Sequence, residues 1–203
     1  MTMVDIPQRS TDESSSPAQQ LQTRFAAVRI SFTWLGVRKT LNTDQKSRAA
    51  ETFGAEGQFL SAGKKLLDTR DAQFQAVTAI RHRIQSYWKS LSLPYPEPGL
   101  RLIRHDDIEL FDRQMARFQD TLAGAVEELN SNLEYLKSDA QQRLGSLYNP
   151  LDYPSTLIGQ FGVVWEFPSI SPPDYLRQLN PQLFQQEQHR MQARFEEAVQ
   201  LAE

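Results

Sequence analysis

The 203-residue sequence contains no cysteine. Disulfides, thiol nucleophiles and cysteine-ligated metal sites are therefore excluded, and this composition is typical of proteins from a reducing compartment. The sequence also lacks an apolar run near the roughly 18–20 residues that a membrane-spanning helix needs. Its N-terminus has no apolar segment of the kind found in signal peptides. We expect a cytoplasmic protein without a membrane partner.

The N-terminal 20 residues are rich in Ser, Asp, Glu and Pro and poor in large apolar side chains. Such a segment buries too little apolar surface to offset the entropy cost of ordering it, so residues 1–20 are predicted to be a disordered tail. The remaining residues, 21–203, have the length of one ordinary domain. We predict a single helical domain with a small sheet.

The net charge of −3 conceals an uneven distribution along the chain. Residues 24–104 hold 14 Lys and Arg against 6 Asp and Glu, a balance of +8, whereas residues 105–203 hold 7 against 16, a balance of −9. This division fits two interpretations, because the halves either pack against each other or leave the basic half to bind an anionic partner. The sequence leaves both open.

Apolar residues recur every three or four positions from about residue 106 to 148. This period predicts a long amphipathic helix, and Asp106 and Asp107 are suited to cap its N-terminus. A second helical pattern covers about 70–92. The proline-rich sequence LPYPEPG lies between the two and cannot continue a helix, so we predict a long antiparallel helical hairpin with a rigid connector.

Two further helices and two strands complete the predicted architecture. Asn180 followed by Pro181 is typical of a helix start and predicts a C-terminal helix, and a shorter helix is expected over 44–54. Alternating apolar and polar residues over about 27–35 and 161–167 predict half-buried strands. We expect these strands to pair into a small two-stranded β element, and the predicted fold class is mainly α.

The stretch FLSAGKKLLD, residues 59–68, invites comparison with a phosphate-binding loop. Such a loop needs two glycines four residues apart, followed by Lys and then Ser or Thr. Here Gly57 and Gly63 are separated by five residues and Lys65 occupies the place of the hydroxyl, so a nucleotide site of that type is excluded. We expect instead a turn at Gly63, with Lys64 and Lys65 in solvent.

No set of residues indicates catalysis. His82, His105 and Asp106 faintly resemble the metal ligands of phosphohydrolases. However, the charges of Arg81 and Arg83 would oppose a divalent ion beside His82, and Asp106 is already expected at a helix start. No G-x-S-x-G nucleophile motif is present. We predict a protein that is not an enzyme and that holds no cofactor or metal.

Seven basic residues are the candidate contacts to a partner, either a protein or a nucleic acid. They lie in the basic segment 38–104, where aromatic residues such as Tyr87 and Trp88 are interleaved with cations. Cations contact phosphates and exposed aromatic rings stack on bases. Most of these aromatics also follow the apolar periodicity, so burial in the core is the simpler explanation for them. The seven residues are Arg38, Lys39, Lys64, Lys65, Arg70, Arg81 and Arg83.

Three short stretches together resemble a known family. Residues 34–41 (WLGVRKTL) resemble a W-x-G-x-(R/K)-K-x-L pattern, residues 63–68 (GKKLLD) a G-S-K-(K/R)-L-(I/L)-D element, and residues 154–161 (PSTLIGQF) a P-x-x-L-x-x-x-F segment. Over about residues 30–175 the pattern is similar to domain-of-unknown-function family 3150 of bacteria and phages. Ala62 before Gly63 departs from the family's pattern at this point.

The resemblance implies a setting and no activity. Genes of this family occur on phages and mobile elements, often near genes for MoxR-like AAA+ ATPases, von Willebrand A-type proteins and DNA-recombination functions. We therefore expect a non-enzymatic helical accessory protein that docks on an AAA+ ATPase or a DNA-processing partner. The alternative is a nucleic-acid-binding module that uses the basic segment 38–104. The apolar seam of the long helix would equally support a homodimer.

Overall fold

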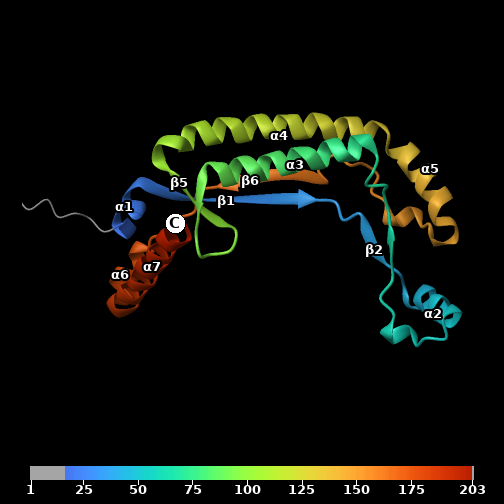
Figure 1. Ribbon diagram of the computed structural model, residues 1–203, viewed down its shortest axis with the longest axis horizontal. Coiled ribbons are helices and arrows are strands. Elements are labelled where there is room, and N and C mark those ends of the chain that lie inside the picture. The colour runs from blue at the N-terminus through green and yellow to red at the C-terminus, as the bar shows by residue number, and fades with distance from the viewer. Residues whose placement is uncertain (1–16, 203) are drawn as a thin grey trace, which may run out of the picture. The chain divides into compact units, whose positions relative to one another are not determined.

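The computed structural model describes residues 17–202 (Figure 1). Most of the predicted tail over 1–20 lies outside the described residues, and helix α1 (Pro17–Arg24) contains its last four positions. The described chain divides into two compact units. Unit 1 contains residues 17–29, 92–107 and 167–202, and unit 2 contains residues 30–91 and 108–166. The single domain expected over 21–203 stays a prediction.

A four-stranded antiparallel sheet contradicts the predicted fold class, which was mainly α with a two-stranded β element. The strand order is β4-β5-β1-β6. The expected pairing of the two distant strands is present, since β1 neighbours β6, but two further strands extend the sheet on the other side of β1. The fold is therefore mixed α/β. The strands are β1 (Phe25–Trp34), β4 (Ser92–Pro94), β5 (Leu100–Arg104) and β6 (Phe161–Glu166).

Strands β4 and β5 form a hairpin within the segment that the sequence predicts to be a rigid connector. β4 pairs with β5 from Ser92↔Ile103 to Pro94↔Arg101, and β5 pairs with the first five residues of β1. Pro94 lies on an edge strand, where a residue without an N–H group is tolerated. Because these strands span only three and five residues, their alternation of apolar and polar residues is weak. The prolines beside them therefore led to the prediction of a connector instead of strands.

In unit 1, the core lies between β5, the start of β1 and the C-terminal helix α7 (Pro181–Ala202). Asn180 Oδ1 accepts a hydrogen bond from Leu183 N at 3.1 Å, as expected of a residue that caps this helix. The short helix α6 (Asp174–Leu179) precedes α7 and packs against it. The buried cluster consists of Ala27, Tyr95, Leu100, Leu102, Phe195 and Ala198.

In unit 2, α3 (Ala72–Ser90) and α4 (Ile108–Ser131) lie side by side, and α4 packs against β6 (Figure 1). The single helix predicted over 106–148 is wrong, because α4 ends at Ser131 and α5 (Leu133–Leu144) begins after Asn132. Apolar residues recur every three or four positions across this break as well, so the sequence pattern does not indicate it. The apolar seam of α4 packs within the chain, and a homodimer stays a prediction. No described helix is long and apolar enough to cross a membrane.

Candidate binding surface

Residues 38–65 of unit 2 form an arm, with a two-stranded ribbon at its base and a small helical tip. The ribbon pairs β2 (Arg38–Thr40) with β3 (Gly63–Lys65) in antiparallel register. Between the strands the chain forms α2 (Thr43–Thr52) and the 3-10 helix η1 (Gly57–Phe59). The turn predicted at Gly63 is wrong, because this residue lies in a strand. A Cβ atom there would approach the Lys39 carbonyl oxygen to 3.2 Å.

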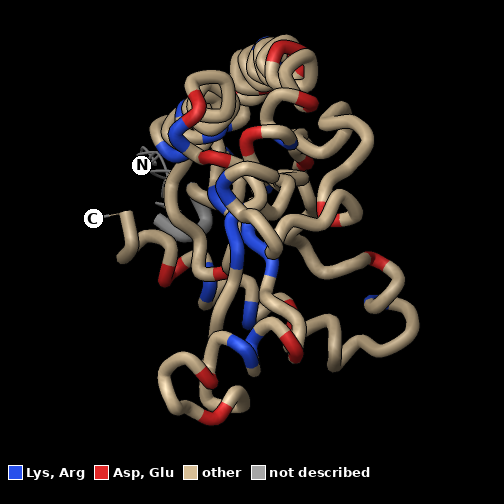
Figure 2. The backbone as a smooth tube through the Cα atoms, turned by 90° about the vertical axis from the view of Figure 1, so that its right-hand side faces the viewer, with Lys and Arg blue, Asp and Glu red and all other residues tan. Residues whose placement is uncertain are grey.

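Four of the seven predicted contact residues meet on the ribbon. Arg38 lies opposite Lys65 and Lys39 lies opposite Lys64. Because side chains alternate along a strand, Lys39 and Lys64 lie on one face and Arg38 and Lys65 on the other. Blue segments of the tube accordingly follow neighbouring strands near the middle of Figure 2. The two faces of the ribbon differ in the residues that they contact.

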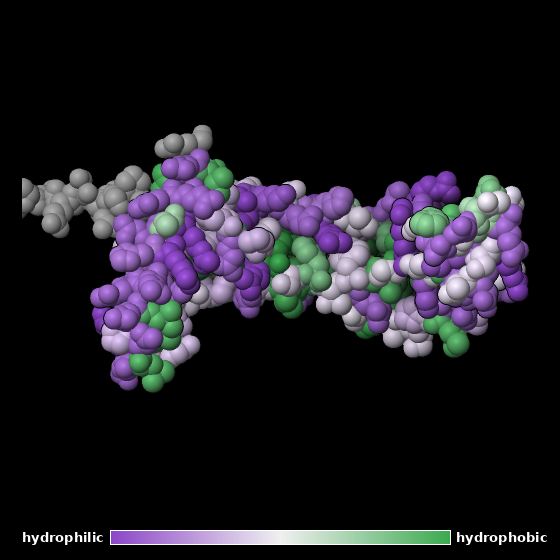
Figure 3. All heavy atoms as spheres, turned by 90° about the horizontal axis from the view of Figure 1, so that it is seen from below, coloured by the Kyte–Doolittle hydropathy of each residue, from purple (hydrophilic) through white to green (hydrophobic). Residues whose placement is uncertain are grey.

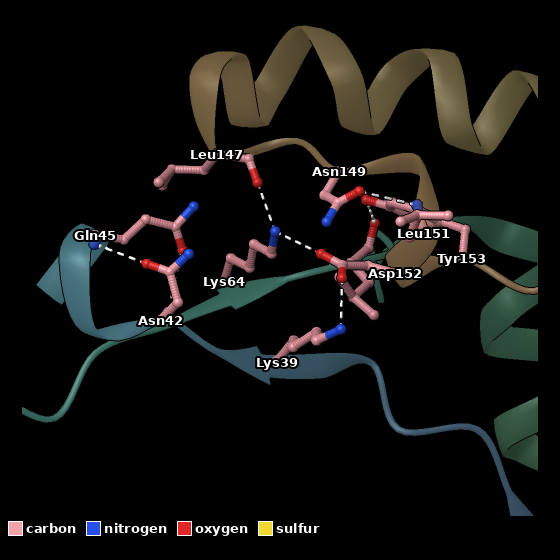
Figure 4. A network of polar contacts seen from close by, with 10 residues as sticks. Lys39, Asn42, Gln45, Lys64, Leu147, Asn149, Leu151, Asp152 and Tyr153 are labelled. Atoms are coloured by element: carbon pink, nitrogen blue, oxygen red, sulfur yellow. Dashed lines mark hydrogen bonds and ion pairs between the residues drawn. The ribbon is translucent and has the colours of Figure 1, made fainter.

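The face with Lys39 and Lys64 is anchored by the carboxylate of Asp152 (Figure 4). Lys64 Nζ lies 2.5 Å from Asp152 Oδ2 and donates to the Leu147 carbonyl oxygen at 2.5 Å, while Lys39 Nζ lies 2.5 Å from Asp152 Oδ1. The side chains of Asp152 and Lys64 are only 3% and 5% exposed, against 53% for Lys39. The prediction that Lys64 lies in solvent is therefore wrong, and its charge serves the fold.

The segment that carries Asp152 is itself fixed by local hydrogen bonds. Asn149 Oδ1 accepts from Leu151 N at 3.0 Å and starts the 3-10 helix η4 (Pro150–Asp152). The hydroxyl of Tyr153 donates to the Leu66 carbonyl oxygen at 3.0 Å. The hydrogen bond from Lys39 and the close ammonium group of Lys64 lower the pKa of the Asp152 carboxyl below its usual range. Asp152 thus stays ionised and holds both strands of the ribbon.

The opposite face of the ribbon is open and positively charged. Its four residues, Arg38, Thr40, Gly63 and Lys65, are all exposed. Within residues 17–202, no carboxylate forms an ion pair with Arg38 or Lys65. Like charges directly opposite each other in a sheet repel and destabilise the pairing. An anionic group brought to this face would relieve that repulsion.

In the tip of the arm, residues 42–62, the largest apolar side chains are exposed to solvent instead of buried. Ala50 is its only buried residue, whereas the side chains of Phe53 and Phe59 are 79% and 81% exposed. Green, hydrophobic spheres accordingly appear among purple ones in the part of unit 2 that contains α2 (Figure 3). Phenylalanine is among the residues most often buried, so these two rings are candidate contacts to a partner.

Helix α2 does not need the phenylalanines for its own stability. Its N-terminus carries a capping box, in which Asn42 Oδ1 accepts from Gln45 N at 2.8 Å and Gln45 Oε1 accepts from Asn42 N at 3.2 Å. Gly57 lets η1 approach α2 closely, since a Cβ atom there would lie 3.3 Å from Ser47 Oγ. The tip is thus held by caps and close backbone packing, and its rings stay available to a partner.

The other three predicted contact residues lie outside the ribbon. Arg70 pairs with Asp68 at 3.2 Å, which lowers the pKa of the Asp68 carboxyl. The Arg81 guanidinium lies over the rings of Trp34, at 4.7 Å from the centroid, and Phe32, at 5.0 Å. Arg83 is exposed on α3. Two of the three are therefore already engaged within the chain.

The residues considered for a metal site are distributed over both units. His82 lies on α3 in unit 2, whereas His105 and Asp106 belong to the 3-10 helix η2 (His105–Asp107) in unit 1. Among residues 17–202, no three His, Asp or Glu side chains are grouped so that they could hold a metal ion. The expectation that the protein binds no metal or cofactor stays a prediction.

Sequence reasoning missed Asp152 and Phe53, and it considered Phe59 only as one of the aromatic residues interleaved with the cations of the basic segment. Asp152 is 113 residues from Lys39, and no spacing rule connects them. A stronger signal existed for the tip, because Phe53 and Phe59 lie among glycines and polar residues, where no apolar period buries them.

In comparisons with known proteins, no family model, no curated protein and no solved structure matches the chain. The resemblance to domain-of-unknown-function family 3150 therefore stays a hypothesis. Residues 34–41 and 63–68 contain the two paired strands of the ribbon, and residues 154–161 directly follow Asp152 and Tyr153.

Proposed function

We propose that this protein is a non-enzymatic binding protein that docks on a protein partner through the arm. The observation that carries the proposal is the tip, which buries an alanine and exposes two phenylalanines. Large exposed apolar side chains are candidate contacts to a protein partner, because covering them removes apolar surface from water. The ribbon below it is held by a buried ion pair, so the rings are presented on a fixed support.

The exposed rings are large enough to dominate an interface. An aromatic side chain buries about 150–250 Å² when fully covered, so rings that are about 80% exposed offer roughly 120–200 Å² each. At about 25 cal/mol per Å², covering each ring contributes about 3–5 kcal/mol before the cost of association. Energies of this size are typical of the few residues that dominate protein interfaces.

The charges of the arm indicate what the partner's surface should carry. Carboxylates on the partner would complement Arg38 and Lys65, and an apolar pocket beside them would receive the phenylalanines. The tip itself carries two basic residues, Lys46 and Arg48, against the three acids Asp44, Glu51 and Glu56. This balance disfavours a phosphate backbone along the tip.

Nucleic-acid binding by the segment 38–104 is the alternative. It is supported by Arg38 and Lys65, but Lys39 and Lys64 already bind Asp152. The resemblance to family 3150 makes an AAA+ ATPase or a DNA-processing protein the first partner to test.

The experiment compares proteins retained from an extract of the source cells by three full-length baits. The baits are the wild-type chain, the double variant Phe53→Ser/Phe59→Ser, and the control Tyr135→Ser. Tyr135 is 70% exposed on α5, so its variant removes an exposed ring outside the arm. We expect a protein captured by the wild type to be lost with the double variant and kept with the control. Equal capture by all three baits would refute docking through the tip.

A second measurement distinguishes nucleic-acid binding from docking on a protein. Labelled single-stranded and duplex DNA are titrated with the wild-type chain over a series of salt concentrations. Binding that weakens steeply with salt and disappears in Arg38→Gln/Lys65→Gln would favour nucleic acid, because phosphate contacts release counterions. Docking on a protein predicts no DNA binding at low salt.

A further inference from the structure

A cleft of about 250 Å³ lies within unit 1. Helix α7 forms one wall, the proline-rich segment 168–173 forms another, and Arg29, Glu97 and Leu100 complete it. The volume equals that of about eight water molecules, and it is smaller than the cavities that hold drug-sized ligands. The cleft therefore suits a small ligand.

Three arginines and two glutamates line the cleft. Arg29 Nη2 lies 3.4 Å from Glu97 Oε1 and Arg194 Nη1 lies 3.3 Å from Glu97 Oε2, so one carboxylate serves two guanidinium groups at long distances. Arg190 Nη1 pairs with Glu187 Oε1 at 2.5 Å.

Arg190 and Arg194 are placed one helical turn apart on α7. Like charges at this spacing repel on a helix. A guanidinium has five N–H donors, whereas the ion pairs engage one nitrogen of each arginine. Donors remain on both arginines for an oxyanion, which guanidinium groups bind in bidentate fashion.

Apolar side chains lie next to these cations. Ile170 and Met191 line the cleft and pack against the core of unit 1, and Leu100 is 4% exposed beneath them. A ligand with only a charged group would leave this apolar surface in water. A ligand with a short aliphatic part would cover it and gain free energy from doing so.

We propose that this cleft binds a small organic anion. Its carboxylate or phosphate group contacts Arg190 and Arg194, and its aliphatic part lies against Ile170 and Met191. The carboxylate of Glu97 competes with the ligand for Arg194, so it limits affinity and selects against weak anions. This site belongs to unit 1 and is independent of the docking function proposed for the arm.

The test is a titration of the full chain with hexanoate, hexyl phosphate, inorganic phosphate and hexanol, followed by calorimetry or by NMR of the arginine Nε–H groups. We expect hexanoate or hexyl phosphate to bind at least tenfold more tightly than inorganic phosphate, and hexanol not to bind. Stronger binding of hexanoate identifies a carboxylate ligand, and stronger binding of hexyl phosphate identifies a phosphate ester. Equal affinities for inorganic phosphate and both hexyl ligands would overturn the apolar part of the proposal.

Three variants locate the binding. Arg194→Gln should weaken it at least tenfold, because it removes a bidentate donor. Glu97→Gln should strengthen it several-fold, because it removes the competing carboxylate. Arg113→Gln is the matched control, since Arg113 is exposed in unit 2 and pairs with Glu109 at 3.9 Å. No binding of any anion at millimolar concentration, or equal weakening by Arg113→Gln and Arg194→Gln, would refute the site.

Discussion

Asp152→Asn should destabilise the ribbon strongly, because it leaves the charge of Lys64 buried without its carboxylate. At 2.5 Å and an effective dielectric constant of about 20, the gross attraction between these two charges is roughly 7 kcal/mol, most of which offsets desolvation. Removing one partner of a buried pair costs about 3–5 kcal/mol. Lys64 keeps the Leu147 carbonyl oxygen as an acceptor, so we expect a loss of about 3 kcal/mol.

Two companion variants test this reasoning. Lys39→Gln should cost under about 1 kcal/mol, because Lys39 is 53% exposed and surface pairs contribute little. The double variant Asp152→Asn/Lys64→Met should be more stable than Asp152→Asn alone, since it also removes the buried charge.

The assay is denaturant unfolding combined with hydrogen exchange at the Leu41 and Leu66 amides, which extend the ribbon ladder at 3.0 and 2.8 Å. A loss below about 0.5 kcal/mol in Asp152→Asn, with unchanged exchange, would refute the anchoring role.

Three further predictions concern the arm. Folding lowers the pKa of Asp152, so the stabilisation by its carboxylate is present above the unfolded pKa of about 3.9 and is lost as pH falls through the folded pKa. The difference in unfolding free energy between wild type and Asp152→Asn should therefore shrink below about pH 4 in urea titrations. A constant difference would contradict this. Gly63→Val should destabilise the ribbon by about 1–2 kcal/mol, because its Cβ would meet the Lys39 carbonyl oxygen at 3.2 Å; unchanged thermal unfolding would count against the close approach. Lys65→Glu should stabilise the ribbon by about 0.5–1 kcal/mol, because it converts a repulsive cross-strand pair with Arg38 into an attractive one. The same variant should weaken partner capture, and a destabilised ribbon would show that Lys65 has a counter-charge.

The sequence predicts those elements whose signal is local. The apolar period predicts helices over most of α3 and α4, and Asn180-Pro181 predicts the start of α7. Alternation predicts β1 and β6 because each strand has six residues or more. The short strands β4 and β5 were not predicted. β4 has only three residues and ends in proline, so it shows no alternation of apolar and polar residues that would indicate a strand.

The candidate site was predicted only in part. Lys39 and Lys64 were identified by their charge, but their burial depends on Asp152, which lies 113 residues from Lys39. Contacts at such separations are created by the fold and leave no spacing in the sequence. The same limit applies to Asn132, where a one-residue break leaves the apolar phase of α4 and α5 intact.

The most direct test of docking through the tip is photocrosslinking. The photoreactive residue p-benzoylphenylalanine is introduced at Phe59 in the full chain, and at Tyr135 as the control, and each protein is irradiated in an extract of the source cells. Both side chains are exposed, at 81% and 70%. We predict a discrete protein adduct from position 59 that is absent from position 135. Adducts from position 135 alone, or adducts from position 59 that contain only nucleic acid, would contradict docking on a protein through the tip.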